Sequence, residues 1–294
     1  MTRLPPASRF ALLCAISLAI GWHPLFRTFA LAESSDEYTH LLLILPISAW
    51  LIFTERASLK AAFQPMVGPG SALLVTALLI GGSSRWLAGS ESDTQLSVSM
   101  LAIVLWWIGS FVLCFGFPVA RRFLFPLLFL FWFVPIPAPA LSRIVALWQQ
   151  GSAISASLLF SAAGVPVTQD GIMLSIPGLT LEVAQECSSL RSSLMLIVTS
   201  MVLAHLFLRS LWRKTFVVLA AIPLSIVKNG IRIFTIAMLG TRVDPGFLHG
   251  SFHHHGGIVF FLVALFAVLV LLWLFHRTEN HWSPNHSRVH RQSG

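Results

Sequence analysis

The sequence predicts an all-α, polytopic integral membrane protein with about eight transmembrane helices, an interfacial helix and short extended segments on the outer face. Hydrophobic residues make up 56% of the 294-residue chain and charged residues only 10%, whereas soluble domains carry about 25% charged residues. The apolar residues form runs that approach the length needed to cross a bilayer. We expect a single membrane domain over residues 1–294, with no separate soluble part.

Eight apolar runs are the candidate spans. Several are shorter than the roughly 20 residues that a perpendicular helix needs, so their ends are approximate. The runs cover residues 10–32, 40–54, 70–88, 96–117, 122–137, 189–208, 214–239 and 257–275.

Basic residues predict the orientation of these spans. With the N-terminus inside, 12 of the 19 Lys and Arg fall on the cytoplasmic side: Arg3, Arg9, Arg56, Lys60, Arg121, Arg122, Arg209, Arg213, Lys214, Arg277, Arg288 and Arg291. Such a bias sets membrane orientation, and an even number of spans returns the C-terminus to the cytoplasm. The net charge of +8 therefore indicates topology, and we expect no nucleic-acid partner.

Residues 140–165 depart from the pattern of apolar runs. They are only moderately apolar and include Arg143, Gln149 and Gln150, which favours a helix lying in, or dipping into, the outer interface. The Asp-Gly pair at 170–171 and the Pro-Gly pair at 177–178 are turn signals. They predict short extended segments after this helix.

Cys187 lies in the stretch EVAQECSSLRSS, where a polar segment meets the apolar run that begins at residue 189. The other two cysteines, Cys14 and Cys114, fall within spans and offer it no disulfide partner at the outer boundary. A free cysteine often serves only as a small apolar residue. If Ser188 or its neighbour caps the following helix, however, the helix N-terminus favours a thiolate at Cys187.

Arg191 follows Cys187 by four residues. If helical geometry extends back to Cys187, the two side chains share one helix face. Arg191 is equally compatible with a snorkelling or phosphate-binding role.

A second polar group occurs in the stretch IVKNGIRIFTIAML, inside the run 214–239. Counting a rise of about 1.5 Å per residue from Lys214 brings Asn229 and Arg232 about 22 to 27 Å across the membrane. They then reach the depth of Cys187. Ionisable residues within spans are costly and indicate function. Lys228 is the weaker candidate, because it also suits a structural bond to a carbonyl.

A third group, FLHGSFHHHGGIVFF, directly precedes the last run. Consecutive histidines point in different directions, and no HExxH helix is present, so we expect no metal. A general base or acid is the better interpretation for His253, His254 or His255. Cysteine and histidine together are what thiol acyl transfer requires, and a nearby arginine can stabilise the thiolate, a substrate carboxylate or the oxyanion.

These motifs resemble those of the exosortase/archaeosortase family of membrane transpeptidases. The resemblance rests on ECSSLRSS (186–193), NGIR (229–232) and HGSFHHHGG (249–257), in that order at successive outer boundaries. YTHLLLILPISAW (38–50), VPIPAPAL (134–141) and GVPV (164–167) support it. Most of 38–275 is covered, which leaves 276–294 as a basic cytoplasmic tail. Ser189 replaces the glycine that is more usual in the cysteine motif.

The resemblance implies a cysteine protease and transpeptidase that cleaves a C-terminal tripartite signal, namely a short motif, a transmembrane helix and a basic end. It implies Cys187 as nucleophile, Arg232 as the arginine of the triad and a histidine as base. We favour His253 over His254 and His255 from its spacing to the following glycines. Arg191, Asn229 and Ser188 would be supporting residues.

The resemblance also implies partners and a location. The partners are exported proteins bearing a PEP-CTERM-type tail, membrane lipid and an acceptor nucleophile that the sequence does not identify; no cofactor is expected. The location is the bacterial inner membrane, with the active site on the periplasmic face. Two other functions fit a polytopic chain: a transporter lined by Arg191, Lys228 and Arg232, and an acyltransferase that uses His253 and Asn229 without a covalent cysteine step.

Overall fold

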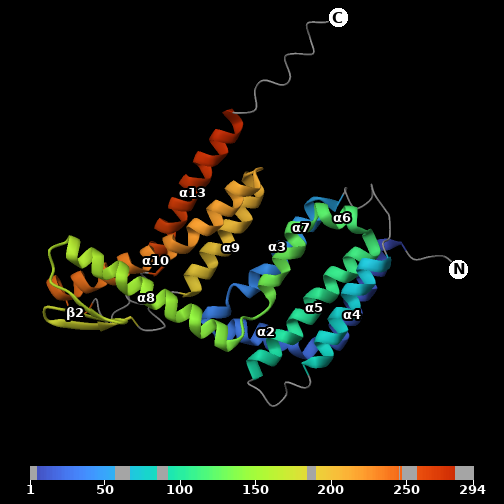
Figure 1. The fold of residues 1–294 in the computed structure, drawn as a ribbon, viewed down its shortest axis with the longest axis horizontal. Helices are drawn as coiled ribbons and strands as arrows, with labels where there is room; N and C mark the ends of the chain where they lie inside the picture. Colours follow the sequence, from blue (N-terminus) through green and yellow to red (C-terminus); the bar gives the residue numbers. More distant parts are fainter. Residues whose placement is uncertain are drawn as a thin grey trace, which may run out of the picture. The chain divides into compact units, whose positions relative to one another are not determined.

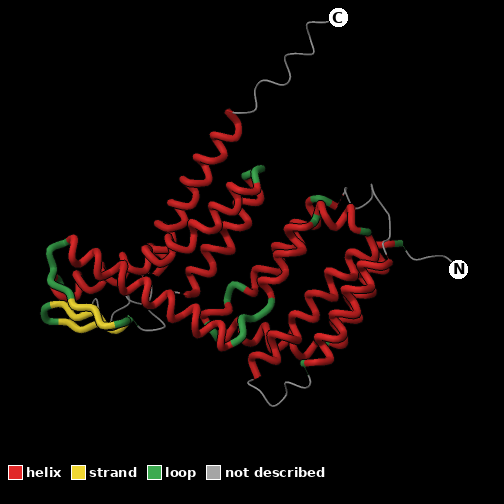
Figure 2. Tube along the Cα trace, in the orientation of Figure 1, coloured by secondary structure: helices red, strands yellow, loops and turns green. Residues whose placement is uncertain are grey.

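The computed structural model describes residues 5–56, 67–84, 92–183, 190–244, 246 and 257–281. The chain divides into two compact units, Met1–Leu141 and Ser142–Gly294. Helices dominate both units, and a small sheet is added in the second (Figure 1, Figure 2). The predicted all-α, multi-pass architecture is confirmed, whereas the single membrane domain stays a prediction.

The first unit contains mostly apolar helices. They are α1 (Pro6–Ile20), α2 (Trp22–Ser34), η1 (Asp36–Tyr38), α3 (Leu41–Thr54), α4 (Val67–Ser83), α5 (Ser92–Phe115), α6 (Phe117–Arg122), α7 (Leu124–Phe129) and η3 (Leu130–Phe133). The helix α8 (Ala138–Ala162) continues into the second unit. The second unit further contains β1 (Thr168–Asp170), β2 (Met173–Ile176), β3 (Leu179–Glu182), α9 (Leu190–Phe207), α10 (Leu211–Arg242) and α13 (Gly257–His281).

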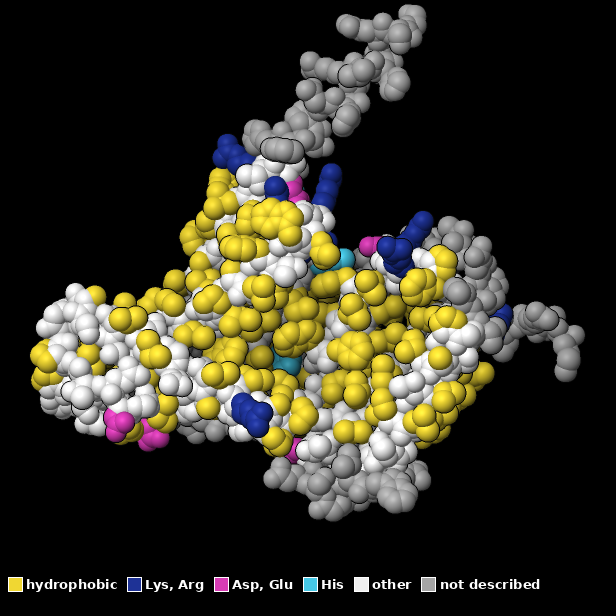
Figure 3. Space-filling model, in the orientation of Figure 1, with side chains coloured by type: hydrophobic (Ala, Val, Ile, Leu, Met, Phe, Trp, Pro, Cys, Tyr) yellow, Lys and Arg dark blue, Asp and Glu magenta, His cyan; other side chains and the backbone are white. Residues whose placement is uncertain are grey.

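Within the described residues, 5 helices are long and apolar enough to cross a membrane, or up to 7 if each of two broken pairs counts as one span. A shorter apolar helix covers Gly68–Ser83. The predicted number of eight spans is therefore not confirmed. Large apolar side chains such as Leu79 and Phe266 are 69% and 67% exposed, and hydrophobic side chains cover much of the surface in view (Figure 3). Such surfaces suit contact with lipid rather than water.

The first predicted span, 10–32, is not one helix. It breaks at Gly21 into α1 and α2, which bend by 76°. The proline at position 24 lacks a backbone N–H, so the carbonyl of residue 20 would lose its partner in a continuous helix. A Cβ on Gly21 would lie 2.7 Å from Ile103 Cδ1 and 2.8 Å from the Ser17 carbonyl oxygen. Both the local sequence and the packing on α5 therefore favour the break.

The predicted run 122–137 and the predicted interfacial helix 140–165 also differ in detail from expectation. The run consists of short helical pieces that end at Phe133, before the proline-rich stretch 134–139. A helix follows, as predicted, but α8 has 25 residues, which is enough to span a bilayer. The two segments together meet the criteria for a broken span or a re-entrant loop. The interfacial location of α8 stays a prediction.

The extended segments form a three-stranded antiparallel sheet in the order β1-β2-β3, drawn in yellow in Figure 2. Gly171 and Gly178 have φ values of 59° and 83°, so the two predicted turn dipeptides lie at the two hairpin turns. Pro177 followed by a positive-φ glycine matches a type II turn. One sheet face packs through Leu174 and Ile176 on buried residues of α8 and α10. The predicted short segments are confirmed; their side of the membrane stays a prediction.

Two sequence stretches that support the family resemblance meet in the first unit. Tyr38, at the end of η1, donates its hydroxyl to the carbonyl oxygen of Ile136 at 2.9 Å. His40 contacts the Trp132 ring edge-to-face, with centroids 6.2 Å apart. Tyr38 and His40 are both buried. The contacts tie the start of α3 to the proline-rich stretch, 98 residues away along the chain.

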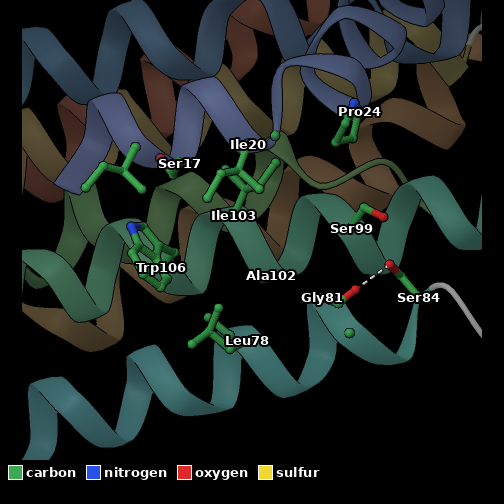
Figure 4. A pocket seen from close by; sticks show the side chains of 14 residues that line it. Ser17, Ile20, Pro24, Leu78, Gly81, Ser84, Ser99, Ala102, Ile103 and Trp106 are labelled. Atoms are coloured by element: carbon green, nitrogen blue, oxygen red, sulfur yellow. Dashed lines mark hydrogen bonds between the residues drawn. The ribbon is translucent and has the colours of Figure 1, made fainter. Parts of the chain in front are cut away.

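A cavity of about 430 Å³ lies in the first unit among α1, α2, α4 and α5. Ile103, Trp106 and Leu78 line it, together with smaller residues such as Gly81 and Ser84 (Figure 4). The Ser84 hydroxyl donates to the Gly81 carbonyl oxygen at 2.7 Å and so satisfies itself locally. None of the lining residues belongs to the predicted site.

Candidate active site

The predicted site residues fall into two groups. Arg191, Asn229 and Arg232 are described, and all three lie in the second unit, on α9 and α10. Cys187, Ser188 and the histidines His253, His254 and His255 lie outside the described residues. The described helices and strands that flank Cys187 and the histidines define the surroundings of the site.

The helices α9 and α10 form an antiparallel hairpin joined at residues 208–210, and α13 packs against both (Figure 1). At the joined end, Glu279 of α13 accepts hydrogen bonds from the backbone N–H groups of Arg209 and Ser210 at 2.9 and 3.0 Å. It also pairs with Arg213 at 3.6 Å. The three helices are thus held in register at the end opposite the first turn of α9.

At the other end of the hairpin, Lys228 Nζ donates to Ser192 Oγ. Lys228 is only 4% exposed. We named a carbonyl as the alternative structural partner of this lysine, but the structure gives a hydroxyl in the first turn of α9. A charged group within a span is costly unless it has a partner, and Ser192 provides one for Lys228. The bond also fixes the level of α10 against α9.

The level of Arg232 follows from this contact. Arg232 lies four residues beyond Lys228, about 6 Å along α10, whereas Leu190 lies two residues before Ser192, about 3 Å along α9. Arg232 therefore extends past the N-terminal end of α9, which begins three residues after Cys187 in the sequence. Arg232 is half-buried and Arg191 is exposed.

Asn229 joins α10 to α8, whereas the neighbouring Lys228 joins it to α9. Its side chain is fully buried, and Nδ2 donates to Ser152 Oγ of α8 at 2.9 Å. The next residue, Gly230, lies so close to α8 that a Cβ would collide with the Ser155 side chain and come within 3.0 Å of the Ala156 nitrogen. Asn229 thus acts within the protein interior as a bond between helices.

Hydrogen bonds also fix the chain at Val183, four residues before Cys187. Val183, which follows β3, donates its N–H to the Ile172 carbonyl oxygen at 3.0 Å. Its own carbonyl oxygen accepts a bond from Gln149 Nε2 of α8 at 2.9 Å. The Val183 side chain is 1% exposed and belongs to the core between the sheet, α8 and α10.

Gln149 and Ser152 are residues that the sequence analysis did not assign to the site. Their spacing of three, with the small residues Ala153 and Ala156 following, places them on one face of a helix. All of these except Gln149 are fully buried. This pattern of polar and small residues on one helix face was the sequence signal for a buried contact. The polar residues of 140–165 were used instead to predict a helix in the outer interface.

Among the described residues, no group of three or more His, Cys, Asp or Glu could hold a metal ion. The three consecutive histidines are not among those residues, so the expectation of a metal-free site stays a prediction. The side chains that the structure brings together are cations, amides and hydroxyls. They suit the binding of negative charge rather than of a cation.

Fold and site together define a polytopic helical membrane protein whose second unit concentrates buried and half-buried polar groups at one end of a helix hairpin. The chain belongs to the transmembrane exosortase family, whose model matches residues 32–270. No curated protein and no solved structure matches the chain.

Proposed function

We propose that this protein is a membrane-embedded cysteine protease and transpeptidase that cleaves the C-terminal tripartite signal of exported proteins. Membership of the transmembrane exosortase family, over residues 32–270, is the observation that carries the proposal. Cys187 is the nucleophile, Arg232 the oxyanion or thiolate stabiliser, and His253 the general base, with His254 or His255 as alternatives. The active site faces the periplasm, and both termini lie in the cytoplasm.

The described geometry supports this assignment in two ways. The positive end of the helix dipole lies at the start of α9, three residues after Cys187, and it favours a thiolate nearby. Arg232 projects from α10 beyond the same helix end. A guanidinium group there suits the negative charge that develops during acyl transfer.

The reaction proceeds through two acyl transfers. His253 takes the proton of Cys187, and the sulfur attacks the carbonyl carbon of the scissile peptide bond while Arg232 stabilises the oxyanion. The C–N bond then breaks, the leaving amine takes the proton from the histidine, and the tail fragment departs. The resulting thioester joins Cys187 to the new C-terminus of the substrate. An amine acceptor attacks it to give a transpeptidation product, and water gives hydrolysis.

The substrate's own tail fits this membrane location. A hydrophobic helix in the tail lies in the bilayer with the enzyme, and its basic end stays in the cytoplasm by the same positive-inside rule that orients this chain. The short motif before that helix is then held at the outer face. We expect it to be of the PEP-CTERM type.

The direct test replaces Cys187 by Ala and follows an exported reporter. The reporter ends in Pro-Glu-Pro, a hydrophobic helix and an arginine cluster, taken from the genome that encodes this chain. We expect full-length reporter to accumulate with Cys187→Ala, because no thioester can form. A Cys14→Ala/Cys114→Ala variant, whose changes lie within α1 and α5, should process it normally.

Normal processing by Cys187→Ala would overturn the proposal and favour the acyltransferase that needs no covalent cysteine step. Solute flux into liposomes containing the purified chain, unaffected by thiol alkylation, would instead support the transporter.

A further inference from the structure

Gln149 and Lys228 bind the described chain on either side of the segment containing Cys187. Val183 is the last described residue before it, and α9 begins directly after it. Gln149 Nε2 binds the Val183 carbonyl oxygen at 2.9 Å, and Lys228 Nζ binds Ser192 Oγ in the first turn of α9. The two side chains come from different helices, α8 and α10.

These two helices are themselves fixed to each other over the stretch that carries the two side chains. Asn229 Nδ2 binds Ser152 Oγ at 2.9 Å, and Trp148 Nε1 binds Ser225 Oγ at 3.1 Å. The close approach at Gly230 adds backbone contact. Gln149 and Lys228 therefore project from one support, and a change at either one alters the chain beside the Cys187 segment rather than the packing of α8 on α10.

The cost of burying Lys228 also needs an explanation. The side chain is 4% exposed within a membrane-spanning helix, and a methionine of similar length would avoid the desolvation penalty of a charge. Among the described residues, Nζ of Lys228 donates to the neutral hydroxyl of Ser192. A cation is thus kept at this level of the hairpin, one turn before Arg232, where a simpler residue would pack at lower cost.

We propose that Gln149 and Lys228 are positioning residues for the nucleophile: Gln149 fixes the chain before Cys187 and Lys228 fixes the helix after it. This inference rests on the proposed function, since it assigns both residues to the thiol of Cys187. Neither touches the substrate. Because a misplacement of about 1 Å can slow a reaction about 100-fold, losing either bond lowers the turnover number while substrate binding is preserved.

The experiment uses the purified full-length chain and the purified tripartite reporter, and measures kcat, KM and the melting temperature. The test variants are Gln149→Met and Lys228→Met, which keep chain length and remove the polar end. The matched control for Gln149 is Gln150→Met, at the adjacent exposed glutamine. The matched control for Lys228 is Ser225→Ala, which removes another hydrogen bond between α8 and α10 only three residues away.

We expect kcat to fall about 10- to 100-fold in each test variant, with KM within about threefold of the parent. The double variant should lose less than the product of the two single losses, because both residues position one group. Ser225→Ala should lower the melting temperature, because it removes a hydrogen bond between α8 and α10, yet retain kcat. Lys228→Arg, which keeps a charged donor, should recover most of the activity.

Three results would overturn the inference. If the test variants have the same kcat as their controls, the positioning role is excluded. The proposed function would still stand in that case, provided that Cys187→Ala is inactive. A loss confined to KM would assign the residues to substrate binding. If Lys228→Met does not fold, Ser192→Ala removes the same bond from α9, and normal kcat in both Ser192→Ala and Gln149→Met would exclude the role. An active Cys187→Ala variant would remove the proposed function itself.

Discussion

Burial distinguishes the two arginines of the predicted site. Arg191 is exposed in the first turn of α9, whereas Arg232 is half-buried on α10 beyond the end of α9. Charges in less solvated surroundings act on their neighbours more strongly. Arg232 is therefore the better placed of the two to stabilise charge that develops in a transition state, and Arg191 is better suited to contact with substrate or lipid headgroups.

Three substitutions test this distinction. Arg232→Gln should lower the kcat for reporter cleavage about 100- to 1,000-fold, as the loss of an oxyanion-stabilising group does. Arg232→Lys should remain well below the parent, because lysine lacks the planar fork of donors. Arg191→Gln should raise KM and largely retain kcat. The reverse ranking of the two Gln variants would assign the catalytic role to Arg191.

Glycines set the approach of neighbouring helices in both units. A Cβ on Gly70 of α4 would lie 2.7 Å from the Leu113 backbone of α5, and a Cβ on Gly230 of α10 would collide with the Ser155 side chain of α8. Small residues at such contacts are how membrane helices gain van der Waals contact without a hydrophobic driving force. At Gly230 the same contact brings Asn229 within reach of Ser152.

We expect alanine substitution to have different effects at two helical glycines. Gly230→Ala should destabilise the chain by about 1 to 3 kcal/mol through overpacking against α8, and it should lower the melting temperature in detergent. Gly82→Ala, where a Cβ meets nothing within 4 Å, should be neutral or slightly stabilising, because alanine is the better helix former. Equal melting temperatures for the two variants would contradict the close packing of α8 and α10.

Hydropathy predicted where the helices occur but not how they are joined. All eight apolar runs contain helix, because backbone groups in lipid must be satisfied within the segment. The break at Gly21 depends on a single missing N–H and on contact with Ile103, which no average over a window detects. Gln149 and Ser152 were not assigned to the site, because the sequence does not show that Val183 and Asn229 are their hydrogen-bond partners.

The site was only partly predictable for a related reason. Motif order and span counting put Asn229 and Arg232 on one helix, and α10 contains both. Their depth relative to Cys187 stays a prediction. The contacts of Lys228 with Ser192 and of Gln149 with Val183 join residues 36 and 34 positions apart along the chain. Such pairs arise from helix packing, and one sequence carries no direct record of them.

At the scale of the whole molecule, the two units differ in what their interiors hold. The first unit has a mostly apolar pocket among its helices, whereas the second contains all the described residues of the predicted site and the sheet that leads towards Cys187. The match to the transmembrane exosortase family includes most of both units. Under the proposed function the substrate carries a membrane helix, and we expect both units to be needed for activity.

Mass spectrometry of a covalent intermediate tests the central claim most directly. Purified chain is mixed with the tripartite reporter, quenched in acid within the first turnover and digested to locate any adduct. We expect the reporter, without its tail, attached to Cys187 and released by hydroxylamine, as a thioester is. Cleavage of the reporter by a chain that never carries this adduct, and that stays active as Cys187→Ala, would contradict the account.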